Sequence, residues 1–390
     1  LLIFWQAPSL SRLIAPGFTG EQITIMSTLL RILLISQIFF SVSGFLTGII
    51  QSHQRFLIPA LAPLFYNFGI VLGTIILTPS LGIYAPAIGV VIGSVLHVAI
   101  QLPLARHLGF KFTFKLDISH TSVKEIVKLV PPRALALGID QIEQFVSVVL
   151  ASLLSAGSLS LLNVSRLLYT IPSTLFGVSI GQAALPALSR ESSLEDKDKF
   201  YHTFSSALIQ VAFLALPVST LFIVLRIPIV RLVFGSSSFP WTATLLTAKA
   251  LAILALSSTF AAIMHLVIRG FYALHNTKTP LIVGFAAAIF DTILSVLLVS
   301  YTDMGILGLA LAISITTIGE SAVLFVLLHK KLELTAAQAK TTTVSLVKII
   351  FVSLVTGIFL WIPMRILDKF VFDTTHTIPL LALAIVTSAI

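Results

Sequence analysis

A succession of long apolar runs is the feature that most constrains this chain. Ten runs are long enough to cross a hydrocarbon core of about 30 Å as helices, and partial runs stand at each end of the sequence. Because lipid offers the backbone no hydrogen-bond partner, such runs must satisfy their own polar groups, and runs of this length do so as helices. The ten runs cover about 23–52, 60–78, 84–106, 131–155, 160–188, 204–225, 242–269, 280–301, 305–329 and 341–363, and the partial runs 1–10 and 377–390.

Composition agrees with a membrane protein. Hydrophobic residues make up 57% of the 390 residues and charged residues only 10%, against about 25% charged in soluble domains. The absence of cysteine excludes a disulfide framework, a thiolate metal site and a cysteine nucleophile. No soluble domain carries the net charge of +9, so a nucleic-acid partner is not expected. We predict an all-α polytopic membrane protein that contacts membrane lipids.

The loop charges predict the orientation. Most loop lysines and arginines follow the runs that end near residues 52, 106, 188, 269 and 329. By the positive-inside rule these loops are cytoplasmic. The alternate loops hold only Arg12, Arg226, Arg231, Arg365 and Lys369.

A weak internal repeat predicts two lobes. The stretch that begins at His53 and ends at Pro59 resembles His275 to Pro280, and Gly82 and Gly305 each open the next helix. The offset of roughly 220 residues spans six crossings, so both copies run the same way and the lobes should form a parallel pseudo-repeat.

Both chain ends fall inside apolar runs, and we therefore interpret the sequence as an internal fragment of a longer transporter-like chain. The predicted parts are 1–110 as the remainder of an N-terminal lobe, 111–128 as a cytoplasmic linker, 129–333 as a C-terminal six-helix lobe, and 341–390 as two additional helices with the last one truncated.

Polar side chains are concentrated in the two runs between Pro131 and Glu191. A polar stripe on an apolar helix of membrane length must face a cavity or another helix rather than lipid. Arg133, Asp140, Gln141 and Glu143 fall on one half of the first helix at about 100° per residue. In the second run a stripe of small and polar residues, with Arg166 on its flank, comprises Asn163, Thr170, Thr174, Gly177 and Gly181.

Each charged residue in these runs has two readings. Arg133 and Arg166 suit an anionic substrate because a guanidinium pairs bidentately with phosphate. Alternatively, Arg133 reaches the nearby interface and Arg166 forms a structural pair with Asp140 or Glu143. The intramembrane carboxylates serve ion or proton coupling, act as counter-charges, or only join helices. They are Asp140, Glu143, Asp291 and Glu320.

Several motifs resemble the MurJ (MviN) lipid II flippases. They are RILLISQIFFSVSGFLTGIIQSHQRFLIPALAPLFYNFGIVLG within Leu29 to Gly73, GSLSLLN and IPSTLFGVSIGQAALPALS within Gly157 to Ser189, the Ala15–Phe18 loop and Gly270 to Ala273. The resemblance implies a fold similar to the multidrug/oligosaccharidyl-lipid/polysaccharide exporters, MATE-like, with two lobes around a cationic cavity and extra C-terminal helices. In one departure, the family's cavity arginine aligns with Leu167, beside Arg166.

The resemblance also implies a function. We expect a flippase of the undecaprenyl diphosphate-linked peptidoglycan precursor, a secondary transporter rather than an enzyme, working by alternating access in the bacterial cytoplasmic membrane. The expected substrate-binding residues are Arg133, Arg166, Asn163, Gln141, Thr170 and Thr174. No cofactor or metal is expected, apart from coupling to a monovalent cation or proton gradient, and a monomer is expected. The alternatives are an exporter of another polyprenyl-linked glycan or a cation-coupled drug exporter. A membrane-embedded transferase would need a His or Asp cluster in a long interfacial loop, and none is present.

Overall fold

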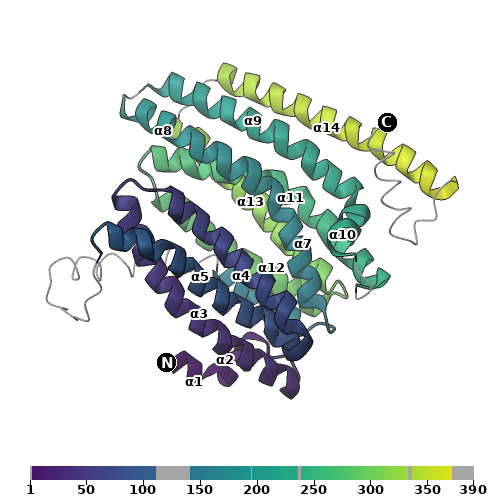
Figure 1. Ribbon diagram of the computed structural model, residues 1–390. Coiled ribbons are helices and arrows are strands. Elements are labelled where there is room, and N and C mark those ends of the chain that lie inside the picture. Colours follow the sequence, from purple (N-terminus) through teal and green to yellow (C-terminus); the bar gives the residue numbers. More distant parts are fainter. Residues whose placement is uncertain (1, 111–140, 195, 236–238, 333–335, 371–390) are drawn as a thin grey trace. The chain divides into compact units, whose positions relative to one another are not determined.

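The computed structural model describes residues 2–110, 141–194, 196–235, 239–332 and 336–370. These residues form helices joined by short turns and contain no strand, which confirms the predicted all-α class (Figure 1). Eight helical segments among them are long and apolar enough to cross a membrane, and one of these, Leu57–His107, holds two helices. The predicted runs that the described residues cover are helical apart from a few turn residues such as Gln6 and Gly305. Of 131–155 the structure describes 141–155, of which 141–152 are helical, whereas 377–390 lies outside the described residues. The chain divides into two compact units, Leu1–Pro131 and Pro132–Ile390.

Within residues 2–110, the first unit has two short helices followed by three long ones. The long helix α3 begins with a capping box: the Thr19 side chain accepts a hydrogen bond from the Gln22 backbone, and the Gln22 side chain accepts one from the Thr19 backbone. The helices are α1 (Leu2–Trp5), α2 (Ala7–Ile14), α3 (Gly20–Ser52), α4 (Leu57–Leu81) and α5 (Ala85–His107), with a 3-10 turn, η1 (Gly82–Tyr84), between the last two.

Glycines let α4 and α5 pack as a close antiparallel hairpin. A Cβ atom on Gly69 would lie 2.6 Å from the Gly93 backbone nitrogen, and one on Gly73 would lie 3.1 Å from that of Gly89. Each helix therefore presents a small-xxx-small pair to the other, the pattern that allows backbones to approach inside a membrane.

A polar cluster joins α3 to α5. Gln101, which is fully buried, donates from Nε2 to the Ser43 hydroxyl at 2.5 Å and accepts at Oε1 from the Thr47 hydroxyl at 2.7 Å. The Ser43 hydroxyl also lies 2.5 Å from His97 Nδ1. Because an unpaired polar group in an apolar interior costs free energy, the mutual pairing of these side chains fixes the register of the two helices.

The second unit is organised around one central helix, α11 (Trp241–Ala273). More than half of its apolar core is buried, and its small residues allow the surrounding helices to approach closely. A Cβ atom on Gly177, for example, would lie 2.6 Å from the Ala262 Cα atom. The other described helices of this unit are the helix 141–152, α7 (Ser158–Pro172), the π-helical turn η2 (Ser173–Val178), α8 (Ser179–Ser193), α9 (Lys197–Val224), α10 (Arg226–Phe234), α12 (Lys278–Tyr301), α13 (Ile306–Leu332) and α14 (Ala336–Phe370).

Matching turns support the predicted repeat. Gln54 and His275 each follow a long helix with positive φ angles of 58° and 54°, and the next backbone N–H in each turn bonds back to the helix, to Ile50 and Phe271 respectively. Gly82 and Gly305, which open the following helix in each copy, have φ angles of 52° and 54°. Glycine adopts this left-handed backbone without steric cost.

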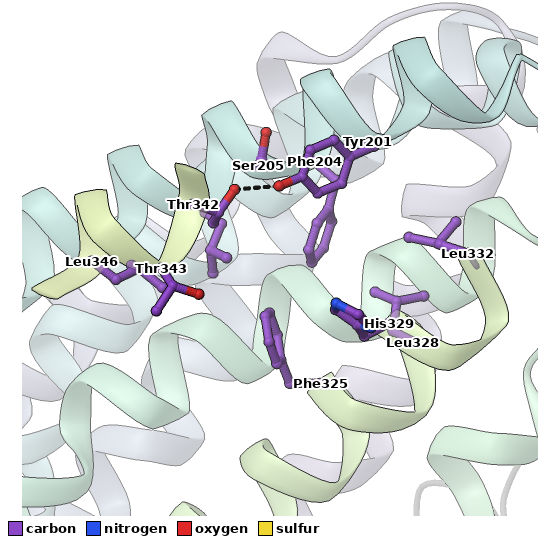
Figure 2. Close-up of a pocket in the computed structure, with 11 residues that line it drawn as sticks. Tyr201, Phe204, Ser205, Phe325, Leu328, His329, Leu332, Thr342, Thr343 and Leu346 are labelled. Atoms are coloured by element: carbon purple, nitrogen blue, oxygen red, sulfur yellow. Dashed lines mark hydrogen bonds between the residues drawn. The ribbon is translucent and has the colours of Figure 1, made fainter. Parts of the chain in front are cut away.

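Helices α9, α13 and α14 enclose a pocket at one end of their spans (Figure 2). Helix α9 begins at an N-cap, Asp196, which accepts a bond from the Lys199 backbone at 3.0 Å and pairs with its ammonium at 2.9 Å. These bonds lower the pKa of the Asp196 carboxyl. Helix α14 lies along α9, where Gly357 accommodates Thr220 (Figure 1).

Candidate functional site

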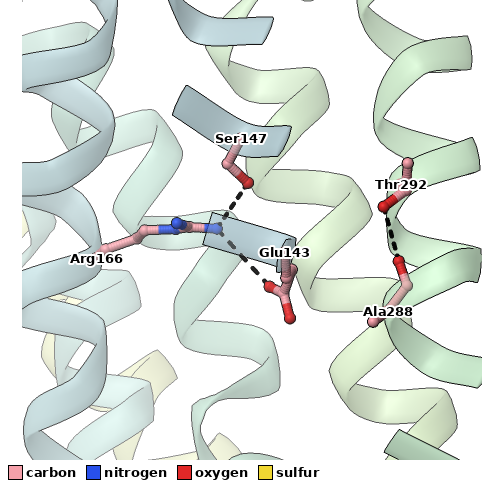
Figure 3. A network of polar contacts seen from close by, with 5 residues as sticks. All are labelled: Glu143, Ser147, Arg166, Ala288 and Thr292. Carbon is pink, nitrogen blue, oxygen red and sulfur yellow. Dashed lines mark hydrogen bonds and ion pairs between the residues drawn. The ribbon is translucent and has the colours of Figure 1, made fainter. Parts of the chain in front are cut away.

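An arginine–glutamate pair lies inside the second unit. The Arg166 guanidinium of α7 donates from Nη2 to the Ser147 hydroxyl at 3.1 Å and lies 3.8 Å from Glu143 Oε1 (Figure 3). The Arg166 side chain is 20% exposed and that of Glu143 34%, so solvent screens the pair in part. Nη2 is the only guanidinium nitrogen that bonds within the described part of the chain. A guanidinium has five N–H donors in all, so most of the Arg166 donors make no hydrogen bond within these residues.

Contacts between α7 and α11 determine where Arg166 points. The Ser165 hydroxyl of α7 donates to the Thr247 carbonyl of α11 at 3.1 Å, and the Ser258 hydroxyl of α11 donates to the Tyr169 carbonyl of α7 at 3.1 Å. With Ser165 held against α11, a rotation of about 100° per residue turns Arg166 toward the helix 141–152. Leu167, the next residue, is 60% exposed. The sequence left Asp140 and Glu143 open as structural partners of Arg166, and the structure pairs Arg166 with Glu143.

The predicted polar stripe on the second run is divided between two environments. Asn163, Thr170 and Thr174 are exposed, and the two threonine hydroxyls donate to carbonyls of their own helix. Gly177 and Gly181 are buried, packed against α11. The single-stripe expectation is therefore wrong beyond Thr174. It assumed one uninterrupted α-helix, whereas the π-helical turn after Pro172 adds about one residue to the turn and rotates the residues beyond it.

A buried carboxylate lies between α12 and α13. Asp291 is fully buried, and neither of its oxygens has a hydrogen-bond partner of ordinary geometry. The Thr316 hydroxyl lies near this carboxylate. The Thr316 and Ser295 hydroxyls are themselves buried without a hydrogen-bond partner. Asp291 is also within electrostatic range of both Glu143 and Arg166. Buried unpaired polar atoms are expensive, so this cluster is the strongest candidate for a function in the described residues.

A groove extends from this cluster along α12 and α13. It encloses about 320 Å³, and Thr316 lines it together with Gly319 and Glu320 on one side and apolar residues such as Phe290 on the other. Glu320 thus stands on the same side of α13 as the hydroxyl beside Asp291. In Figure 3, the neighbouring Thr292 hydroxyl donates within α12 to the Ala288 carbonyl at 2.8 Å, so it supports the helix rather than the site.

Not every predicted site residue joins this region. Arg133 and Asp140 lie outside the described residues, and Gln141 is exposed. Sequence reasoning overlooked Ser147 and Thr316. Ser147 stands one turn after Glu143 and Thr316 one turn before Glu320, so the i, i+4 spacing to a named carboxylate was the available signal.

The oxygen atoms of this region suit a small hard cation. Carboxylates and hydroxyls are the ligands that such ions prefer, and Asp291 and Thr316 carry one of each. No group of three or more His, Cys, Asp or Glu side chains with metal-site geometry occurs in the ranges that the structure describes.

The helical architecture and the charged interior define a multi-pass membrane protein with a transporter fold. A solved multidrug resistance MATE family transporter of the MOP superfamily, in an inward-facing conformation, matches 87% of this chain and 77% of its own with a TM-score of 0.72 at 16% identity. That likeness shows the fold and confirms the predicted MATE-like class.

The chain belongs to the MurJ family. The family described as "Lipid II flippase MurJ" matches residues 1–380. A solved structure titled "Lipid II flippase MurJ, inward closed conformation" matches all of this chain and 78% of its own, with a TM-score of 0.80 and 25% identity. Among named relatives, the lipid II flippase MurJ of Burkholderia cenocepacia is 25% identical over 318 residues and the probable lipid II flippase MurJ of Vibrio cholerae 29% over 298.

The chain spans part of these relatives. The matches cover 80% of this chain and 61% of the Burkholderia protein, and 75% of this chain and 55% of the Vibrio protein. Membership of this family confirms the predicted family and agrees with the predicted multi-pass location in the bacterial cytoplasmic membrane.

Proposed function

We propose that this chain carries out the translocation of lipid II, a polyprenyl diphosphate-linked cell-wall precursor, across the cytoplasmic membrane by alternating access. The family match over residues 1–380 carries this proposal. The likeness to MATE transporters concerns the fold alone and does not favour the drug-exporter alternative. We also propose that the protein acts as a monomer. In this proposal, residues 129–333 form one lobe of the transporter, and residues 341–390 form additional helices beside it.

Arg166 is the described residue best suited to receive the anionic headgroup. It is held by Ser147 and by a 3.8 Å pair with Glu143, which is longer than a tight charge-assisted bond of about 2.7–2.9 Å. A diphosphate could replace Glu143 as its partner without unfolding the surrounding helices. Arg133, Gln141, Asn163, Thr170 and Thr174 remain proposed contacts on the same two runs.

We further propose that the buried carboxylates couple transport to a monovalent cation or a proton. A cation at Asp291 would neutralise a charge that has no hydrogen-bond partner, with Thr316 as a second oxygen ligand and Glu143 nearby. Neutralising Asp291 would also remove a repulsion that acts on Glu143, and so would alter the pair that holds Arg166. Glu320 would lie on the path by which the cation reaches Asp291. Asp140 is proposed as a further counter-charge.

The test is rescue of cells depleted of their own flippase by the full-length gene. Because hydrogen bonds to charged groups contribute about 1.5–3 kcal/mol, Arg166→Ala should reduce rescue by roughly tenfold or more, and Arg166→Lys should restore only part of it. Arg190→Ala provides a matched control, since Arg190 is exposed at the far end of α8.

Rescue should be scored together with the amount of protein in the membrane. Full rescue by Arg133→Ala, by Arg166→Ala and by the double variant would refute the proposed role of both arginines. Binding of lipid II rather than another polyprenyl-linked glycan can be measured by native mass spectrometry on the same variants.

A further inference from the structure

The pocket between α9, α13 and α14 is separate from the arginine site. None of the residues that line it belongs to the Arg166–Glu143 pair or to the Asp291 cluster. Its lining comes from the first turns of the α9 and α14 spans and from the last turns of α13. All three portions stand at the same end of their spans, so the pocket lies at the edge of the membrane rather than at its centre.

The walls of this pocket are apolar and well packed. Phe204 and Leu208 of α9 and Leu328 of α13 are buried, and Leu346 of α14 completes the lining from the opposite side. The Tyr201 and Thr342 hydroxyls are hydrogen-bonded and tie α9 to α14 beside the pocket (Figure 2). This bond fixes the wall that α9 and α14 form beside the pocket.

Positive charge stands next to the apolar lining. His329 lines the pocket, and Lys330 and Lys331 follow it in the last turn of α13, where both are exposed. The loop charges place this end of the helices on the cytoplasmic side. Anionic lipids give a cytoplasmic leaflet its negative surface potential and attract lysine and arginine side chains close to the membrane.

We propose that this pocket holds one acyl chain of an anionic membrane phospholipid whose phosphate lies beside His329, Lys330 and Lys331. The lipid is a bound component of the protein and not its transported substrate. The volume of about 200 Å³ is below the roughly 300–1,000 Å³ of pockets for drug-sized ligands, and it suits a stretch of a single chain.

The basic side chains of His329, Lys330 and Lys331 make the pocket selective for anionic phospholipids. An acyl chain that leaves the bilayer for this pocket moves from one apolar environment to another, so burial adds little driving force. Attraction between the lipid phosphate and the basic side chains therefore distinguishes an anionic lipid from a zwitterionic one. A bound lipid would join α14, which packs mainly on α9, to α13 as well.

The experiment is photolabelling of the full-length protein in nanodiscs of phosphatidylethanolamine and phosphatidylglycerol. A phosphatidylglycerol probe with a diazirine in its acyl chain should label peptides that contain 201–208 and 325–332. It should label them about fivefold more than a phosphatidylcholine probe with the same chain. The combined change of His329, Lys330 and Lys331 to glutamine should remove this preference without emptying the pocket of label.

Two matched pairs of variants test the pocket itself. Ser205→Phe and Leu346→Trp add bulk at lining positions and should reduce labelling severalfold, whereas Ser206→Phe and Val347→Trp add the same bulk at exposed neighbours and should not. The Leu346 pair decides the matter if Ser205→Phe does not fold. Undiminished labelling in the filled variants, equal labelling by the two phospholipids, or labelling only by a polyprenyl phosphate probe would overturn the proposal.

Discussion

The two copies of the repeated helical hairpin, α4–α5 in the first unit and α12–α13 in the second, share a backbone plan and differ in the groups they enclose. Both begin after a left-handed residue, Gln54 or His275, and both turn at a glycine with positive φ. The α4–α5 interface is a row of glycines in which one backbone touches the other. The α12–α13 interface holds a buried aspartate and two buried hydroxyls without partners.

Corresponding positions show how this difference arises. Counted from the equivalent turns, Gly93 of α5 corresponds to Thr316 of α13, and Ile70 of α4 corresponds to Asp291 of α12. His97 likewise corresponds to Glu320. Where glycine brings the helices into contact, no side chain or ion fits between them, and the hairpin becomes a rigid support. Where Thr316 replaces Gly93 and Asp291 replaces Ile70, the same fold gains buried polar groups that can respond to charge.

The largest effect is expected from filling the glycine interface. Gly93→Leu would drive a side chain into the Tyr66 backbone, and overpacking of this kind costs about 1–3 kcal/mol or more. We expect a marked loss of folded protein in a detergent melting assay monitored by size-exclusion chromatography. Gly48→Leu in α3 is the control, because no atom lies within 4 Å of a Cβ there. Equal melting of the two variants would show that the α4–α5 interface is looser than described.

The second prediction concerns the buried acid of the other hairpin. Asp291→Asn removes a charge that has no hydrogen-bond partner, and such groups cost about 1–3 kcal/mol when buried. Melting should therefore shift upward while rescue of flippase-depleted cells falls. Asp303→Asn, in the exposed turn that joins the same helices, should change neither. A lower melting temperature for Asp291→Asn would mean that the carboxylate stabilises the hairpin, and would end its assignment as an ion-coupling group.

A smaller effect should come from the polar cluster of the first unit. Ser43→Ala removes a buried hydroxyl that accepts from Gln101 and bonds to His97, at a cost of about 1 kcal/mol. Flipping per folded molecule should stay unchanged, because this cluster joins helices rather than serving transport. The control is Ser41→Ala, whose hydroxyl is exposed and donates within its own helix. A selective loss of flipping at normal stability would remove the contrast between the two hairpins.

Much of the architecture could be predicted because it depends on local properties. The apolar runs and the repeat of turns around Pro59 and Pro280 require only hydropathy and short-range backbone chemistry, and the described helices agree with them. The arrangement of the candidate site was harder to predict from the sequence. The i, i+3 and i+4 rule placed Asn163, Thr170 and Thr174 together correctly but failed at Gly177, because hydropathy does not reveal a π-helical turn.

The partner of Arg166 shows what the sequence predicts and what only the tertiary structure decides. That a cation in an apolar helix must find an anion follows from desolvation, and Asp140 and Glu143 were the evident candidates on the neighbouring run. Which way Arg166 points depends on α11, whose contacts with Ser165 and Tyr169 orient the whole of α7. Hydropathy, charge and turn chemistry thus determine the class of this protein and predict its orientation, because solvation acts on each segment separately. Helix packing alone decides which polar groups meet, because rotation about a helix axis is set by neighbours distant in the chain.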